Sequence, residues 1–223
     1  MSNNPIFLVR NRNPIFNKRP INWTKRVDLS GVRTTTYPVG GVTSIEAGTA
    51  LWTWAQIQEG IANVTNKDNP TLIAISTKAT TNNWNGLQRG FFLFDTSNVP
   101  GTATISTARF RFVLANGTTI DNFSESVILV AGNNHFNNDI ILDDHQSRGS
   151  VAFSSSVTMA SLTANGSTYN NMTLNAAGIA AIVKGGITKL CLLCLSDFNN
   201  ISPVWSASLS SEIHPRTAAA GVS

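Results

Sequence analysis

Short apolar runs separated by turn-forming residues restrict this chain, more than any other feature, to a β fold. The runs are four to nine residues long, and turn sequences such as NKDNP (66–70), NNWNG (82–86), ANGTT (115–119) and ANGST (164–168) stand between them. Short strands spaced in this way are typical of an all-β sandwich or barrel. We expect strands at 42–47, 72–77, 90–94, 106–114, 127–130, 150–153 and 189–195.

The clearest strand pattern is ARFRFVL, residues 108–114. Phe110, Phe112 and Leu114 alternate with Arg109 and Arg111, so the two sets point to opposite faces of a strand. One face is therefore predicted to be buried and the other solvated.

Two segments have helical character. Residues 53–62 contain an amphipathic turn or two, although Gly60 weakens the prediction. Residues 174–186 are a better candidate, because Asn175 stands where a helix N-cap belongs and Gly185 and Gly186 follow as a stop.

Positive charge is concentrated at the start of the chain. Residues 1–33 hold seven Lys or Arg against one Asp, a net +6, and the other 190 residues hold nine against eleven, a net −2. The same segment repeats Asn-Pro-Ile-Phe at 4–7 and 13–16. Proline keeps the backbone extended before each Ile-Phe pair, which is suited to burial in a partner. We interpret 1–41 as an extended basic arm whose anchoring residues are Ile6, Phe7, Arg10, Arg12, Ile15, Phe16, Lys18 and Arg19.

Other interpretations of this arm stay open. The Ile-Phe pairs are also compatible with an edge strand of the chain's own domain. Nucleic acid is a weaker candidate as the main partner, because the seven basic residues are spread over 33 positions and interrupted by Pro and apolar residues. The opposite charges of arm and body also predict that the protein is a homo-oligomer at low salt.

The sequence contains no familiar catalytic motif, so we expect no enzyme activity. His135, His145 and His214 are isolated from nucleophile motifs, and Asp143, Asp144 and His145 are interpreted as an exposed loop rather than an acid–base pair. No cofactor is expected. Calcium is a candidate ligand because hard oxygen donors recur in the loops, although their spacing matches no known calcium loop; they are Asp121, Asn122, Asp139, Asp143 and Asp144.

The two cysteines, Cys191 and Cys194, form a C-x-x-C inside an apolar, strand-like run. Residues three apart on a strand point to opposite faces, so these thiols should not meet. We predict buried, reduced, structural cysteines and no zinc site.

Two blocks of the sequence carry a more specific pattern. The first is QRGFFLFDTSNVPGTATISTARFRFVL (88–114), and the second runs from a Tyr through a Gly-Ile helix to a late Asp. Together these blocks resemble the DNRLRE family of β-sandwich domains. The residues that fill the family's positions are Arg89, Phe91, Phe92, Phe94, Asp95, Ser97, Pro100, Ala103, Ile105, Ala108 and Phe110, then Tyr169, Thr173, Leu174, Asn175, Gly178, Ile179, Thr188, Leu190 and Asp197.

The resemblance implies an antiparallel, jelly-roll-like β-sandwich at 42–213, with one or two short helices, between the arm (1–41) and a C-terminal tail (214–223). Family members resemble carbohydrate-binding modules and also occur in phage virions. A single module behind a basic arm, with only 13% charged residues, favours a structural virion protein of a tailed bacteriophage, such as a head fibre or decoration protein. The arm would then dock on capsid or tail proteins, and the module would be exposed on the virion surface.

The alternative function is glycan binding, by a carbohydrate-binding module or a tail-associated adhesin. Trp84 is the candidate stacking residue, because it lies in the polar sequence TTNNWNGLQ and is expected to be exposed. No apolar run approaches the length of about 18 residues that a membrane span needs, so no membrane association is expected.

Overall fold

The computed structural model describes residues 38–46, 50–60, 63–66 and 72–222. The chain divides into two units, Met1–Val32 and Arg33–Ser223, and all described residues belong to the second. The arm and its eight anchoring residues lie outside the described residues. The fold is therefore that of the second unit alone.

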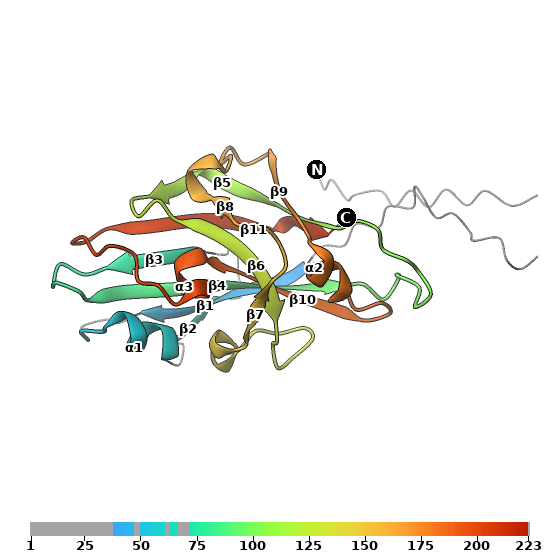
Figure 1. Cartoon of the computed structure of the whole chain (residues 1–223), viewed down its shortest axis with the longest axis horizontal. Coiled ribbons are helices and arrows are strands. Elements are labelled where there is room, and N and C mark those ends of the chain that lie inside the picture. Colours follow the sequence, from blue (N-terminus) through green and yellow to red (C-terminus); the bar gives the residue numbers. More distant parts are fainter. Residues whose placement is uncertain (1–37, 47–49, 61–62, 67–71, 223) are drawn as a thin grey trace, which may run out of the picture. The chain divides into compact units, whose positions relative to one another are not determined.

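The described residues form antiparallel β structure with a few short helices, which confirms the predicted fold class (Figure 1). The strands are β1 (Pro38–Glu46), β2 (Val64–Asn66), β3 (Ile73–Thr77), β4 (Trp84–Asp95), β5 (Arg109–Asp121), β6 (Ser126–Gly132), β7 (Arg148–Ala152), β8 (Val157–Thr158), β9 (Tyr169–Thr173), β10 (Ile187–Cys194) and β11 (Ser210–Val222). The helices are α1 (Trp54–Glu59), α2 (Ala176–Ala180) and α3 (Leu195–Asn199), with the 3-10 turns η1 (Leu142–Gln146) and η2 (Met159–Ser161).

Each of the seven predicted strands overlaps an observed one, and both predicted helices are present in shorter form. Strands β2, β8, β9 and β11 were not predicted. Residues 214–222, expected to be a tail, form the second part of β11 and pair with β5 through Val222. Residues that were expected to lie outside the domain therefore contribute to β11, which lies between β3 and β5 in the sheet.

Strand β4 is the centre of the architecture. It pairs with β1 along Gly86–Phe94, with β3 over Trp84–Gln88 and with β10 over Gly90–Asp95. Because β1 follows one edge of β4 over this length, β3 and β10 must share the other edge. Two series of strands diverge from that shared edge, β10-β6-β7 and β3-β11-β5-β9.

The two series face each other across one apolar core. Strands β4 and β5 are three steps apart in the ladder, about 14 Å in a flat sheet, yet the rings of Phe92 and Phe110 lie 5.0 Å apart. The far ends of the series also meet, because Ser154 after β7 bridges Leu174 after β9. The curled sheet is thus joined at both ends around its core.

A second, smaller core covers the opposite face of β4, β6 and β10. Phe91, Val130 and Cys191 belong to it, whereas Cys194 belongs to the main core. Both cysteines are buried and unbridged, and their membership of different cores confirms that they lie on opposite faces of β10. Strands β4, β6 and β10 therefore have two buried faces, which accords with the continuously apolar sequence 91–94 of β4.

Candidate functional site

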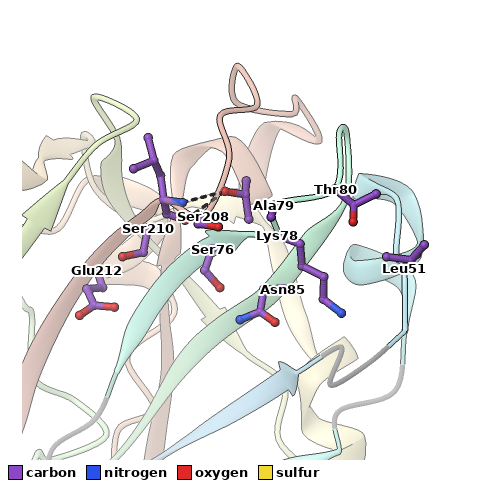
Figure 2. Close-up of a pocket in the computed structure, with 11 residues that line it drawn as sticks. Leu51, Ser76, Lys78, Ala79, Thr80, Asn85, Ser208, Ser210 and Glu212 are labelled. Atoms are coloured by element: carbon purple, nitrogen blue, oxygen red, sulfur yellow. Dashed lines mark hydrogen bonds between the residues drawn. The ribbon is translucent and has the colours of Figure 1, made fainter.

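A shallow depression of about 750 Å³ opens where the β3–β4 turn meets the start of β11 (Figure 2). Its lining is mostly polar and includes hydroxyl, amide, ammonium and carboxylate groups. The side chains around it include those of Leu51, Ser76, Lys78, Thr80, Asn85, Ser208, Ser210 and Glu212.

The register of three strands places the floor of the depression. Ser76 of β3 lies opposite Ser210 of β11 and opposite Gly86 of β4. A bulge in β4 makes Trp84 the partner of Thr77, so Asn85 is the extra residue between two paired positions. Bulges commonly redirect a side chain in this way, and here Asn85 is exposed while Trp84 is buried.

Backbone and hydroxyl hydrogen bonds hold the rim. The Thr77 amide donates to the Leu209 carbonyl at 2.9 Å, and the Leu209 amide donates to Thr77 Oγ1 at 3.0 Å. The Ser208 amide donates to the Lys78 carbonyl at 3.3 Å, and the Lys78 ammonium donates to the Ala50 carbonyl. Ser208 also has a φ of 54°, an unusual value for a residue other than glycine. The rim is therefore fixed by contacts between two loops distant in sequence.

The arrangement suits binding of a polar ligand better than nucleophilic catalysis. Ser210, Glu212 and His214 lie on one face of β11, and His214 Nε2 is 3.4 Å from Glu212 Oε1. However, Ser210 and His214 are four residues apart on an extended strand, about 13 Å. A serine–histidine hydrogen bond of the kind that activates a nucleophile needs about 3 Å.

The expectation that Trp84 is exposed is wrong. Its side chain is 2% exposed and contacts Trp54, with ring centroids 4.7 Å apart. The sequence NNWNG resembles a loop, but Trp84 opens β4 and the bulge turns its indole into the core. A buried ring cannot stack on a sugar, so glycan binding through Trp84 is excluded in this conformation.

A fully buried ion pair lies on the face of β4 that is covered by the second, smaller core. Arg89 and Asp197 are both 0% exposed and form a fork, with Arg89 Nε 2.7 Å from Asp197 Oδ2 and Nη2 2.8 Å from Oδ1. Arg89 also donates to the carbonyls of His145 and Gln58, and Gln58 Nε2 donates to Asp197 Oδ1 at 3.1 Å. The pair thus connects β4, α1, η1 and α3.

Electrostatics keep this pair ionised. Burial opposes ionisation of Asp197, but the Arg89 guanidinium, its hydrogen bonds and the nearby Arg148 together hold the pKa of Asp197 below its ordinary value of 3.8. Arg89 and Asp197 both fill positions of the DNRLRE resemblance, although nothing in the sequence showed that they pair. Because the pair has no access to solvent, its role is structural.

The segment Asp143–His145 is not the exposed loop that the sequence predicts. Asp143 is exposed, but Asp144 and His145 are buried in η1. The Asp144 carboxylate accepts from the His135 amide at 2.8 Å and from the Ile141 amide at 2.9 Å. Burial opposes ionisation of Asp144, and these hydrogen bonds nevertheless place its pKa below the ordinary value. The Asp144 carboxylate thus holds together the two ends of the loop between His135 and Ile141.

The candidate calcium ligands are engaged separately. Asp121 accepts from the Glu125 amide and from Ser211 Oγ, Asn122 donates to the Ser210 carbonyl, and Asp139 accepts from the Ile140 amide. Within the described part of the chain, no three His, Cys, Asp or Glu side chains are grouped closely enough to hold a metal ion. The described residues therefore provide no site that supports the calcium prediction.

Two sequence comparisons give no match. No protein-family model matches the sequence, and a search of curated proteins finds no match. Among the residues that the structure describes, no helix is long and apolar enough to cross a membrane.

Proposed function

We propose that this protein is a non-enzymatic structural subunit of a tailed-phage virion, in which the N-terminal arm anchors a displayed β domain. The observation that carries the proposal is the bracing of the described domain. Its sheet is joined at both ends, by β4 and by the Ser154–Leu174 bridge, and the Arg89–Asp197 pair connects β4 with three further elements, α1, η1 and α3. Such a domain suits display on a particle, where resistance to local unfolding matters.

The sequence supplies the second support, because positive charge is segregated into the first 33 residues. A basic segment with two Ile-Phe pairs has the chemistry to bind an acidic, partly apolar socket on a capsid or tail protein. Burial of one such pair is worth about 3–5 kcal/mol before ordering costs, so two pairs can hold where one does not.

The test is incorporation into particles. A chain lacking residues 2–33 should fail to join particles purified without the protein, and full-length chain should join them. A matched variant, Ile6→Ala with Phe7→Ala, keeps the charges and removes one apolar pair, so its incorporation should be reduced rather than abolished. Undiminished incorporation of the truncated chain would contradict the anchoring role.

Glycan binding is the second candidate, and the depression at β3, β4 and β11 favours it over the buried Trp84. Hydroxyl and amide groups of Ser76, Asn85 and Ser210 converge there, and Leu51 at the rim is 57% exposed, which offers an apolar surface to a sugar ring. A glycan array with wild type and with Ser76→Ala/Asn85→Ala tests this, with the exposed Ser155→Ala as control. Binding unchanged by the double substitution would contradict the site.

A further inference from the structure

Strand β5 lies between β11 and β9 in the sheet (Figure 1). Three arginines lie on β5 and β11: Arg109, Arg111 and Arg216. Arg109 and Arg111 alternate with the buried Phe110 and Phe112, so both point away from the core. Arg216 lies opposite Val113, which has the same orientation on β5 as Arg109 and Arg111 but is itself buried. We call this surface the arginine face; on β9 it continues with Tyr169, Asn171 and Thr173, which lie opposite Val113, Arg111 and Arg109.

The positive charge of the arginine face is not neutralised locally. Among the described residues, no carboxylate forms an ion pair with Arg109, Arg111 or Arg216. The acidic side chains of these strands have other partners. Asp121 accepts a hydrogen bond from Ser211 Oγ, and Glu212 Oε1 is 3.4 Å from His214 Nε2. Like charges on neighbouring outward positions of a sheet repel one another, so the face is complementary to an anionic ligand.

Arg111 is held in a defined orientation. Its guanidinium carbon lies 4.2 Å from the centroid of the Tyr169 ring, within the range of a cation–π contact. Its Nε is buried and has no hydrogen-bond partner within the described part of the chain. Arg109 and Arg216 are exposed beside it. The face therefore combines one oriented guanidinium with two accessible ones.

We propose that the arginine face binds an acidic polysaccharide that carries sulfate or carboxylate groups. Guanidinium forks match both anions with paired hydrogen bonds. Outward positions on one strand recur about every 6.6 Å and strands lie about 4.8 Å apart, so several anionic groups of one polymer can be contacted together. The amide of Asn171 and the hydroxyl of Thr173 lie on the same face and can bond sugar hydroxyls.

Two other occupants fit less well. Single-stranded nucleic acid needs successive aromatic platforms for its bases, and Tyr169, the aromatic residue that β5, β9 and 210–216 of β11 present outward, already stacks with Arg111. The chain's own residues 1–33 carry a net charge of +6 and would be repelled. A polymer with recurring anionic groups and sugar hydroxyls is the better match.

The inference goes beyond the proposed virion role and does not depend on it. The test uses the full chain and chondroitin sulfate as probe, with neutral dextran and an oligo-dT strand as comparison ligands, in isothermal titration at 50 and 300 mM salt. Arg109→Gln/Arg216→Gln should weaken binding of chondroitin sulfate at least about tenfold, because two charge-assisted contacts are lost. Both side chains are exposed, so the fold should be retained, which circular dichroism verifies.

Two control variants distinguish binding at the arginine face from nonspecific attraction by positive charge elsewhere on the chain. Lys184→Gln removes an exposed positive charge outside the face and should change affinity less than about twofold at 300 mM salt. Arg10→Gln/Arg12→Gln/Lys18→Gln/Arg19→Gln removes four charges from the arm and should leave chondroitin sulfate binding within about threefold at that salt. Loss of binding in the arm variant with retention in the Arg109/Arg216 variant would overturn the proposal, as would tighter binding of oligo-dT or no binding of chondroitin sulfate at millimolar concentration.

Discussion

At the scale of single residues, the buried ion pair makes the largest demand on the fold. Two charges removed from water must satisfy each other, and Arg89 and Asp197 do so with two bonds shorter than 3 Å and with support from Gln58 and Arg148. Loss of either partner would leave a buried charge unpaired. The structure therefore depends on this pair even though it has no access to ligands.

The first prediction concerns Asp197→Asn, which keeps the shape of the side chain and removes its charge. At pH 7 it should lower the free energy of unfolding by about 3–5 kcal/mol, because the Arg89 charge stays buried without its partner. The pKa of Asp197 is lowered in the folded protein, so its contribution is fully present above the ordinary, unfolded value of 3.8. The contribution is lost as pH falls through the lower, folded value.

The gap between wild type and Asp197→Asn should therefore narrow below pH 3.8. Urea unfolding at pH 7 and at a pH below 3.8 where both proteins still fold measures it. Asp143→Asn, at an exposed position of the same chain, should stay within about 0.5 kcal/mol of wild type at pH 7. An equal gap at both pH values would show that Asp197 acts through packing rather than through charge.

The second prediction concerns Trp84, whose sequence context indicates a ligand-binding loop and whose position is in the core. Trp84→Ala should reduce the free energy of unfolding by about 3–5 kcal/mol. Trp205→Phe is the control, since this side chain is partly exposed and makes one hydrogen bond, to the Asn83 carbonyl. Thermal unfolding followed by circular dichroism measures both. A Trp84→Ala protein as stable as wild type would contradict the burial of the ring.

At the scale of elements, the short helices secure the sheet. In α1, Thr53 Oγ1 accepts from the Gln56 amide and Gln56 Oε1 accepts from the Thr53 amide, a complete capping box. In α2, Asn175 Oδ1 accepts from the Gly178 amide, which confirms the predicted cap, and Asn175 Nδ2 donates to the Ala152 carbonyl. Helix α2 is thereby attached to the end of β7, next to the Ser154–Leu174 bridge.

The third prediction tests this attachment. A Cβ on Gly178 would lie 2.7 Å from the Phe153 carbonyl oxygen, a backbone atom that cannot move aside easily. Gly178→Ala should therefore lower the free energy of unfolding by about 1–3 kcal/mol, despite the better helix propensity of alanine. Gly101→Ala is the matched control, because a Cβ there meets nothing within 4 Å. It should be neutral or slightly stabilising, and an equal effect of the two changes in urea unfolding would contradict the close approach of α2 to β7.

At the scale of the whole molecule, the net charge of the chain outside residues 1–33 overstates the negative charge that its surface presents. The chain outside residues 1–33 has a net charge of −2, but Glu125, Asp144 and Asp197 are buried and held by hydrogen bonds. Several of the acids that make the body negative are thus not presented to a partner. This lowers the expected strength of arm-to-body attraction without removing it.

The fourth prediction is that the full chain self-associates weakly at low salt and that the association fades at 300 mM salt, where charges more than about 6 Å apart are largely screened. Arg10→Gln/Arg12→Gln/Lys18→Gln/Arg19→Gln should reduce it, whereas Lys184→Gln should not. Light scattering at 20 and 300 mM salt measures the mass. A full chain that stays monomeric at low salt would favour the alternative in which the Ile-Phe pairs pack on their own domain.

Local pattern determined much of the fold. The alternation of Phe110, Phe112 and Leu114 with Arg109 and Arg111 places one face in the core and one outside, and the structure confirms it. The separation of Cys191 from Cys194 likewise needs no knowledge of other segments. These features depend on the two-residue period of a strand, which any seven-residue window contains.

The tertiary structure determined the contacts and positions that no short stretch of the sequence predicts. The partner of Arg89 is 108 residues away and that of Gln58 is 139 residues away, so no periodicity predicts either contact. Trp84 is buried, against expectation, and Asn85 is exposed because a bulge in β4 shifts the register against β3. The depression and the arginine face are made by strands that are distant in sequence and adjacent in the sheet. Strand pairing is set by the burial of whole faces, which depends on all strands together, whereas strand formation is set by the neighbours of each residue.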